Sequence, residues 1–471
     1  MYYKLAEPFA FRGFRRLPYT VRAESGEHVD DKPIFFDKPT FMQLLHCDGE
    51  HDICAENLSD DVRLTFADMI NAGVLVKSDS PLAPPKSYQR YKVYPCRYVD
   101  KVHRAITGKC NFRCRHCPVS APDNRHPQPT LEQCLATVAE FKRCGIRKVD
   151  ITGGEPFIRD DWEKIFDALA DARIKIGIIF TNASLLTDRV LDVLEANNQY
   201  PTFQLSFDGL GWHDWLRGVD GAEVQAIDGF KLLRDRNFRA TASMCVHRLN
   251  RHTLRDTANF LASLGVAALM AGTPQELGIW KRYAQEYALT FDEAWQMYRE
   301  YIPQWYADGT PLDIHLEGFF SIRRDNPRSY EITFMQKMSA EADWSKVSAC
   351  GSIQHGIFVT AEGRVVPCMG FADTVIADKF PETFGRSLSE ALEDKFYRGV
   401  LDIKMSDYLT AQPKCARCPQ FHACGGGCLL DGMTDAGDML VPDERVCNFH
   451  LNIGAAAVGE VVDNAVRSYL N

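Results

Sequence analysis

Residues 101–117 read KVHRAITGKCNFRCRHC, a short segment that leads into three cysteines, Cys110, Cys114 and Cys117. The apolar positions at 102–107 predict a buried strand, and the cysteines then fall in the loop at its carboxyl end. Three thiolates can hold three irons of a four-iron cluster and leave the fourth iron without a protein ligand. Because C-x3-C-x2-C also occurs in zinc sites, the spacing alone leaves the metal open.

A second signal follows the next predicted strand, at residues 148–152, and reads Gly153-Gly154-Glu155-Pro156. The glycines allow another segment of backbone to approach closely, and the Glu155 carboxylate can accept hydrogen bonds from an ammonium group. A structural turn seldom needs an acid between glycine and proline. Two loops at the carboxyl ends of neighbouring parallel strands would form one site.

Strand and helix patterns alternate from about residue 100 onward. Repeated strand–helix units predict a parallel sheet with helices outside, as a closed or partly open (β/α) barrel. We expect strands at 102–107, 148–152, 174–180, 203–207, 240–246 and 266–270, and helices at 131–141, 162–169 and 291–306.

The cysteine loop and the Gly-Gly-Glu motif together resemble the radical S-adenosylmethionine (SAM) superfamily. The resemblance implies an α/β fold with a partial (β/α)6 TIM-like barrel, and cleavage of SAM to a 5′-deoxyadenosyl radical that abstracts hydrogen from a substrate. Taken alone, Ser206 and Arg217 also fit a strand-end serine and a surface arginine. The SAM contacts that the resemblance implies are Gly153, Gly154, Glu155, Asn182, Ser206 and Arg217.

Seven further cysteines lie near the C-terminus, and four of them form the run C-x2-C-x5-C-x3-C. The pattern resembles the SPASM domain of radical SAM peptide and protein maturases, which implies two auxiliary [4Fe–4S] clusters and three in total. Two zinc sites are the alternative. The implied ligands are Cys415, Cys418, Cys424 and Cys447 for one cluster, and Cys350, Cys368 and Cys428 for the other.

The second of these sets is one ligand short. Relatives that close this cluster carry another cysteine shortly after the position of Cys350, whereas residues 351–356 here read GSIQHG. His355 is a candidate fourth ligand, with a packing histidine as the alternative. An open iron could bind a substrate cysteine thiolate and hold it near a carbon radical, which would give a thioether.

Residues 1–95 form a separate module by their pattern. A helix at 39–45, a helix capped by Ser59 and a strand at 74–76 suit a winged helix. The module resembles the PqqD-like recognition element of ribosomally made, modified peptides (RiPPs), which implies that a leader peptide binds as an added strand. A structural cap on the barrel is the alternative. A DNA-binding role would need a basic face, and the only basic cluster is Arg12, Arg15 and Arg16.

Composition limits the class of protein. The net charge is −9, no run of about 18 apolar residues occurs, and the first residues lack a signal peptide, so we expect a cytoplasmic enzyme without nucleic-acid or membrane partners. We expect the cysteines outside the motifs to be small buried residues rather than paired: Cys47, Cys54, Cys96, Cys134, Cys144 and Cys245. The expected divisions are 1–95 recognition module, 96–320 barrel, 321–345 linker, 346–452 SPASM domain and 453–471 closing helix.

The leading hypothesis is a RiPP maturase of the sactipeptide or ranthipeptide type, which forms a thioether and takes electrons from a donor such as flavodoxin or ferredoxin. Carbon–carbon cross-linking is the alternative within this class. A sulfatase maturase fits less well, since those enzymes have an aspartate where Met369 follows Cys368. A multi-cluster electron carrier and a zinc-stabilised regulator are the alternatives from other classes.

Overall fold

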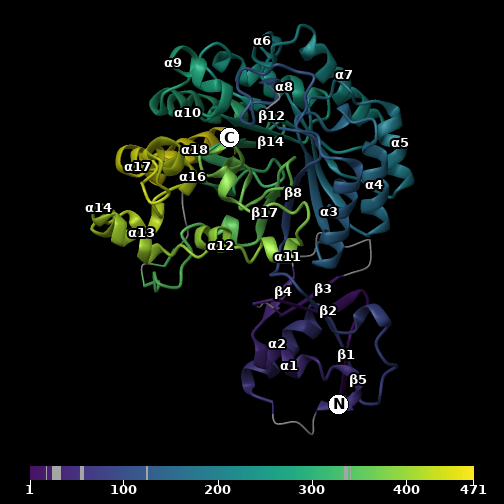
Figure 1. Cartoon of the computed structure of the whole chain (residues 1–471). Helices are drawn as coiled ribbons and strands as arrows, with labels where there is room; N and C mark the ends of the chain where they lie inside the picture. Colours follow the sequence, from purple (N-terminus) through teal and green to yellow (C-terminus); the bar gives the residue numbers. More distant parts are fainter. Residues whose placement is uncertain are drawn as a thin grey trace.

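A computed structural model describes residues 1–16, 19–23, 33–53, 58–123, 126–333, 338–339 and 341–470. A small N-terminal module lies at one end of a larger body, which contains the long sheet and the C-terminal helices (Figure 1). Among the described helices, none is long and apolar enough to cross a membrane.

The N-terminal module contains both helices that the sequence predicts. Ser59 accepts a hydrogen bond from the Val62 amide at the start of α2, and Gly73, with a φ of +70°, follows its end. The module has more strands than we expected, in sheets ordered β5-β1-β6 and β4-β3-β2-β7. Its elements are β1 (Tyr2–Leu5), β2 (Phe9–Phe14), β3 (Tyr19–Ala23), β4 (Ile34–Phe36), α1 (Lys38–Leu44), β5 (Asp48–Asp52), α2 (Asp60–Asn71), β6 (Leu75–Ser78) and β7 (Lys92–Tyr94).

The six strands predicted between residues 100 and 270 are all present, and they lie parallel in chain order. They are β8 (Lys101–Ala105), β9 (Lys148–Thr152), β10 (Lys175–Thr181), β11 (Thr202–Ser206), β12 (Ala240–Cys245) and β13 (Ala268–Gly272). The intervening helices cover the outer face of this sheet (Figure 1). They are α3 (Leu131–Arg143), α4 (Trp162–Asp171), α5 (Asp188–Ala196), α6 (His213–Arg217), α7 (Ala222–Asp235) and α8 (Leu254–Ser263).

The sheet extends beyond the predicted strands on both sides. On one side β14 (Asp313–Leu316) continues the parallel order, and β15 (Phe320–Ile322) and β16 (Tyr330–Glu331) follow antiparallel. The expected linker at 321–345 is therefore wrong in its first part, since β15 and β16 belong to the sheet. On the other side, β17 (Gly356–Val359) pairs parallel with β8, and β18 (Val365–Val366) follows it. The described strands form an open sheet, because its two end strands, β16 and β18, do not pair.

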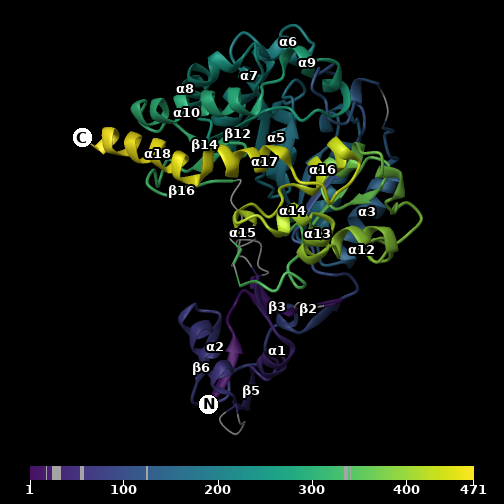
Figure 2. The same cartoon turned by 90° about the vertical axis from the view of Figure 1, so that its left-hand side faces the viewer.

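Short helices follow β18, and a long C-terminal helix ends the chain. Helix α18 (Gly454–Leu470), which the sequence predicted, packs along α10 (Phe291–Ala307) through the buried residues Val458 and Val462 (Figure 2). The short helices are α11 (Leu388–Ala391), α12 (Lys395–Leu401), α13 (Met405–Ala411), α14 (Pro413–Ala416), α15 (Phe421–Cys424), α16 (Leu429–Ala436) and α17 (Glu444–Asn448).

The cysteines outside the motifs differ in part from expectation. Cys47 and Cys134 are buried, as predicted. Cys96 and Cys144 instead form a disulfide, so the prediction of free thiols is wrong for this pair. The disulfide joins the segment after β7 to the end of α3, and it therefore links the N-terminal module to the barrel. Cys245 ends β12, and Cys54 lies outside the described residues.

Candidate functional site

The loop after β8 brings Cys110, Cys114 and Cys117 to the carboxyl end of the sheet. Backbone hydrogen bonds anchor this loop to the end of α6, where the amides of Arg113 and Arg115 donate to the carbonyls of Arg217 and Leu216 over 3.1 and 2.9 Å. Amide groups also point at the sulfur atoms: Phe112 N lies 3.4 Å from Cys110 Sγ, and Ala121 N lies 3.3 Å from Cys117 Sγ.

The three thiols suit a cationic metal centre. Burial raises the pKa of Cys110 to about 12 and that of Cys117 to about 11, and the neighbouring thiol of Cys114 raises both pKa values further. Such thiols ionise near neutral pH only when a cation lies beside them. Three converging sulfur donors with amide donors around them therefore fit an iron–sulfur cluster, which the sequence predicted at this position.

Gly153 and Gly154 pack against the backbone that leads into Cys110. The Gly154 and Glu155 amides donate to the carbonyls of Thr107 and Lys109 over 3.0 and 2.9 Å. A Cβ atom at Gly154 would lie 2.1 Å from the Lys109 carbonyl oxygen, and one at Gly153 would lie 2.5 Å from that of Thr107. Both positions need glycine because this close backbone pairing fixes the cysteine loop to the end of β9.

Glu155 is fully buried and already accepts hydrogen bonds from the chain. Its carboxylate receives Thr181 Oγ1 and the Asn182 amide, each over 2.8 Å, and the Phe157 amide over 3.3 Å. Burial raises the pKa of Glu155 to about 7, although these donors lower it. The carboxylate thus holds the end of β10 beside the cysteine loop, and its contact with a SAM ammonium group stays a prediction.

Asn182 and Ser206 lie at the ends of β10 and β11. The side-chain nitrogen Nδ2 of Asn182 donates to Asn111 Oδ1 over 3.0 Å and lies 4.0 Å from Cys110 Sγ. The end of β10 therefore touches the cysteine loop directly, whereas Ser206 is half-buried one strand further along the sheet. Their contacts with SAM stay predictions.

Arg217 is buried, which contradicts the surface alternative. Its guanidinium forms two hydrogen bonds with the Asp208 carboxylate, at 2.6 and 3.2 Å, and its Nη1 lies 3.8 Å from Cys114 Sγ. Burial would raise the pKa of Asp208, yet Arg217 holds it below its ordinary value. The sequence analysis missed Asp208, although an acid directly after a predicted strand at 203–207 was the available signal.

His116 and Cys245 complete this buried group. A ring nitrogen of His116, a carboxylate oxygen of Asp208 and the sulfur of Cys245 all lie within 4.8 Å of one another, a spacing that would suit a metal ion. Because the Arg217 guanidinium already balances the Asp208 charge, the burial of the carboxylate needs no metal ion to explain it.

In the C-terminal region, Cys415, Cys418, Cys424 and Cys447 lie near one another, and their shared role as ligands stays a prediction. The pKa of Cys424 is raised to about 11, first by burial and then by the thiols of Cys447, Cys418 and Cys415, so these groups are near neighbours. Apolar residues, including Tyr408 and Phe421, pack around them. Four neighbouring thiols could hold a metal centre, and both the centre and the identity of its metal stay predictions.

The other three cysteines also lie together, beside a cavity. The Cys350 thiol raises the pKa of Cys368, and the Cys368 thiol raises that of Cys428, although burial is the largest cause for both. Cys350 and Cys428 line a cavity of about 400 Å³ between the ends of the barrel strands and the cysteine region. Cys428 is exposed to this cavity. The protein around it still buries most of the thiol, and this burial raises the pKa of Cys428 to about 12.

His355 does not belong to this set. Its ring stacks on Phe35 and contacts Tyr98, with centroids 6.3 and 5.6 Å apart, so it faces the N-terminal module. It therefore has a packing role. The cavity instead presents His315 and Glu317 from the end of β14, and burial raises the pKa of Glu317.

Comparisons with known proteins find a family model that matches part of the barrel. The model of the radical SAM superfamily matches residues 105–261. AdoMet-dependent heme synthase of Oleidesulfovibrio alaskensis is 23% identical over 73% of this chain and 86% of its own length. The antilisterial bacteriocin subtilosin biosynthesis protein AlbA of Bacillus subtilis is 22% identical over 70% of this chain and 66% of its own length.

A solved structure resembles almost the whole chain. Streptococcus suis SuiB, in its crystal structure with the precursor peptide SuiA, aligns with 94% of this chain and 99% of its own chain. The TM-score is 0.61 and the sequence identity is 15%, so the likeness concerns the fold.

Proposed function

Residues 105–261 form a radical SAM domain, and from this premise we propose that the chain modifies a ribosomally made precursor peptide by radical chemistry. The names of the relatives support a peptide substrate, since AlbA belongs to the biosynthesis of a bacteriocin and SuiB was crystallised with its precursor peptide. The N-terminal module supports it too, because it presents a site for an extended chain, as described below.

In this proposal, the SAM-binding cluster lies in the loop that carries Cys110, Cys114 and Cys117. These thiols would hold three irons of a [4Fe–4S] cluster, and the position left open would take the amine and carboxylate of SAM. When bound there, the cluster and SAM would supply a 5′-deoxyadenosyl radical able to abstract hydrogen from the substrate. Gly154 and Glu155 hold this loop at the strand ends, which supports their assignment to the SAM site.

The C-terminal cysteines would hold two further clusters, as the SPASM resemblance implies. One set has four thiols, whereas Cys350, Cys368 and Cys428 provide three. Cys350 and Cys428 line the cavity, which Cys424 of the four-thiol set also borders. Residues 346–452 contain no cysteine outside these two sets, and His355 faces elsewhere. This pairing of three thiols with a cavity of about 400 Å³ is the observation that carries the thioether proposal.

In this proposal a substrate cysteine enters the cavity and its sulfur bonds to a carbon of another residue. The reaction would remove one hydrogen atom from that carbon and one proton from the thiol. A cluster held by Cys350, Cys368 and Cys428 would supply an acceptor for the remaining electron. Glu317, His315, Asp431 and Asp443 line the cavity. Because Asp431 and Asp443 are paired with Arg445, we assign the proton to Glu317 or His315.

The leader of the precursor would bind the N-terminal module. Strand β4 ends its sheet and pairs only with β3 among the described strands, which leaves its other edge for a peptide strand. A groove of about 530 Å³ runs between β4 and α2, with Ile34, Phe35 and Met69 among its lining residues. An extended chain with apolar side chains would fit this groove.

Mass spectrometry of a candidate precursor tests the function. The reconstituted enzyme with dithionite and SAM should remove two hydrogens from the peptide and protect one cysteine from alkylation. A product that has lost two hydrogens but keeps all its thiols alkylatable would replace the thioether by a carbon–carbon link. A peptide of unchanged mass, with SAM consumed, would contradict the peptide proposal.

A tetrapyrrole is the second candidate substrate, because a relative is named AdoMet-dependent heme synthase. The groove at β4 favours the peptide, because a peptide backbone can pair with the edge of a strand and a tetrapyrrole cannot. Formation of heme from an iron tetrapyrrole, seen by its absorption spectrum, would favour this candidate instead.

A further inference from the structure

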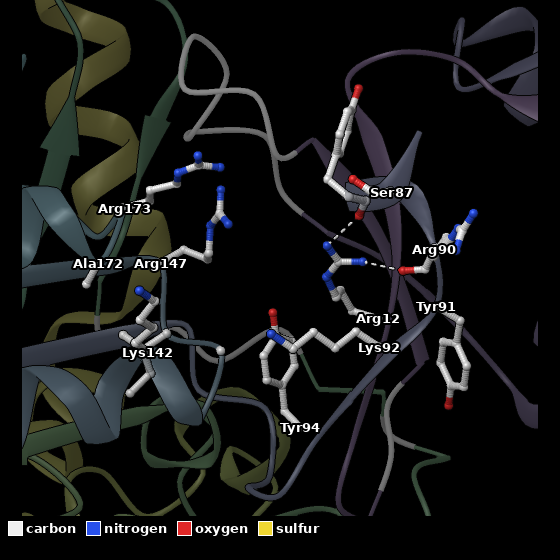
Figure 3. A pocket seen from close by; sticks show the side chains of 13 residues that line it. Arg12, Ser87, Arg90, Tyr91, Lys92, Tyr94, Lys142, Arg147, Ala172 and Arg173 are labelled. Atoms are coloured by element: carbon white, nitrogen blue, oxygen red, sulfur yellow. Dashed lines mark hydrogen bonds between the residues drawn. The ribbon is translucent and has the colours of Figure 1, made fainter. Parts of the chain in front are cut away.

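A second cavity, of about 460 Å³, lies where the N-terminal module meets the barrel (Figure 3). One wall consists of Arg12 from β2 and residues 87–94, which include β7. The opposite wall consists of the end of α3, the turn into β9, and the residues that follow α4. The two walls come from distant parts of the chain, so this cavity exists only in the assembled protein.

Contacts on both sides hold the cavity in shape. Arg12 donates to the carbonyls of Tyr88 and Arg90 over 2.8 and 3.1 Å, which orders the segment before β7. The Tyr94 ring lies against Gly145, where a Cβ atom would approach the ring to 2.7 Å. The disulfide between Cys96 and Cys144 then ties one wall to the other.

The cavity is strongly basic, although the chain carries a net charge of −9. No Asp or Glu occurs among the described residues that line it. Figure 3 shows the side chains of Lys142, Arg147 and Arg173 on one wall, opposite Arg12 and Lys92. Lys142, Arg173 and Lys92 form no ion pair with any carboxylate in the described part of the chain, so their charges are available to a ligand.

The described backbone around the cavity does not offer the amide groups that bind a compact phosphate. Helix α3 ends at Arg143 and α4 ends at Asp171, so the helix ends that border the cavity are carboxyl ends. Such ends present carbonyls and a negative partial charge, whereas phosphate sites use the amides of helix amino ends. A peptide offers both partners: its carboxylates pair with the basic side chains, and its amides can donate to carbonyls.

Strand β7 adds a place for the backbone of such a peptide. It pairs with β2 and with no other described strand, so one edge of β7 has no strand partner. We propose that this cavity binds an acidic segment of the precursor peptide. The inference rests on the proposed function, since it assumes a peptide substrate, and it adds a second contact beyond the groove at β4.

A binding experiment with the full, cluster-loaded chain tests the inference. The probe is a short, capped, fluorescent peptide of alternating Glu and Ala, followed by fluorescence anisotropy at low salt. We expect Arg173→Glu and Lys142→Glu each to weaken binding about tenfold or more, because a repulsive charge replaces an attractive one. Lys164→Glu is the matched control, since Lys164 is exposed on α4 and does not line the cavity, and its binding should match that of the unchanged protein.

Two further arms separate the alternatives. The same peptide with Gln in place of Glu should bind at least about tenfold more weakly, and raised salt should weaken the Glu peptide. Equal binding of the Glu peptide and the Gln peptide would overturn the inference. So would a loss of Glu-peptide binding in the Lys164 variant as large as that in the Arg173 variant. Tighter binding of a short oligothymidylate that is lost in the Arg173 variant would overturn it in favour of a nucleic acid. The assay is independent of SAM cleavage, so a failure of the radical chemistry and a failure of this site give different results.

Discussion

At the scale of single residues, the cysteine loop is placed by backbone contacts that only small side chains allow. Gly154 shows this best, because its amide pairs with Thr107 while its α-carbon faces the Lys109 carbonyl. The motif suggested that another segment of backbone lies close to the glycines, and the structure shows that this segment is the one that leads into Cys110. The sequence could not reveal that partner, because the contact joins two loops that are more than 40 residues apart.

The variant Gly154→Ala should therefore displace the cysteine loop. A Cβ atom 2.1 Å from the Lys109 oxygen would force apart the loops that follow β8 and β9. We therefore expect loss of SAM cleavage and a fall of about 2 kcal/mol or more in the free energy of unfolding. Gly399→Ala is the control, since a Cβ atom there meets nothing within 4 Å. An active and fully stable Gly154→Ala protein would contradict the packing described here.

Glu155 predicts a dependence of stability on pH. Its pKa is about 7 in the folded protein and near 4.5 when exposed, so the folded state holds this proton more tightly. The group therefore stabilises the fold most below pH 4.5, and up to about 3 kcal/mol is lost as the pH rises to 7. Urea unfolding of the metal-free protein should show this slope, and Glu155→Gln should remove it. Glu132→Gln, at an exposed position, should leave the slope unchanged.

At the scale of elements, the regular pattern predicted the strands from β8 to β13 and the helices α3 and α4, because their apolar positions recur with a clear period. The first strands of the N-terminal module were missed, since short strands with mixed residues have no clear period. Strand β14 was missed because its four residues, DIHL, carry too little pattern. The link from α6 to β11 was also hidden, since it depends on the Asp208–Arg217 pair rather than on a periodic face.

This pair predicts a large effect from one substitution. Asp208→Asn leaves the Arg217 guanidinium buried beside the cysteine loop without its counter-charge, so we expect a loss of about 3–5 kcal/mol in the free energy of unfolding. The double variant Asp208→Asn/Arg217→Met should recover part of that loss, because it removes the unpaired charge. Thermal unfolding of the unchanged protein, the single variant and the double variant measures both effects. An Asp208→Asn protein as stable as the unchanged protein would refute the role of the pair.

At the scale of the whole molecule, the chain contains three groups of cysteines and the two proposed binding surfaces. The division of the C-terminal cysteines into two groups follows from the resemblance to the SPASM domain, and it stays a prediction. The sequence did not predict the cavity beside Cys350 and Cys428, the basic cavity, or the disulfide between Cys96 and Cys144. All three depend on segments that meet only after folding.

The division of labour between the clusters gives a prediction at this scale. Cys368→Ala should abolish cross-linking of the peptide while SAM cleavage continues, because the variant keeps Cys110, Cys114 and Cys117. It should also lose about a third of the iron, if each centre holds a four-iron cluster. Peptide mass spectrometry and iron analysis measure these changes, with Cys134→Ala, a buried free cysteine, as the control. Full cross-linking by the Cys368 variant would show that the three-thiol set takes no part.

The most direct test of the account is the yield of 5′-deoxyadenosine from anaerobically purified, iron-loaded protein mixed with dithionite and SAM. We expect the unchanged protein to form it and Cys114→Ala to form none, because the cluster would lose one of its three protein ligands. An electron carrier would form none in either case. Purified protein that holds zinc instead of iron, or a Cys114→Ala variant that still forms 5′-deoxyadenosine, would contradict the assignment of the SAM-binding cluster to this loop.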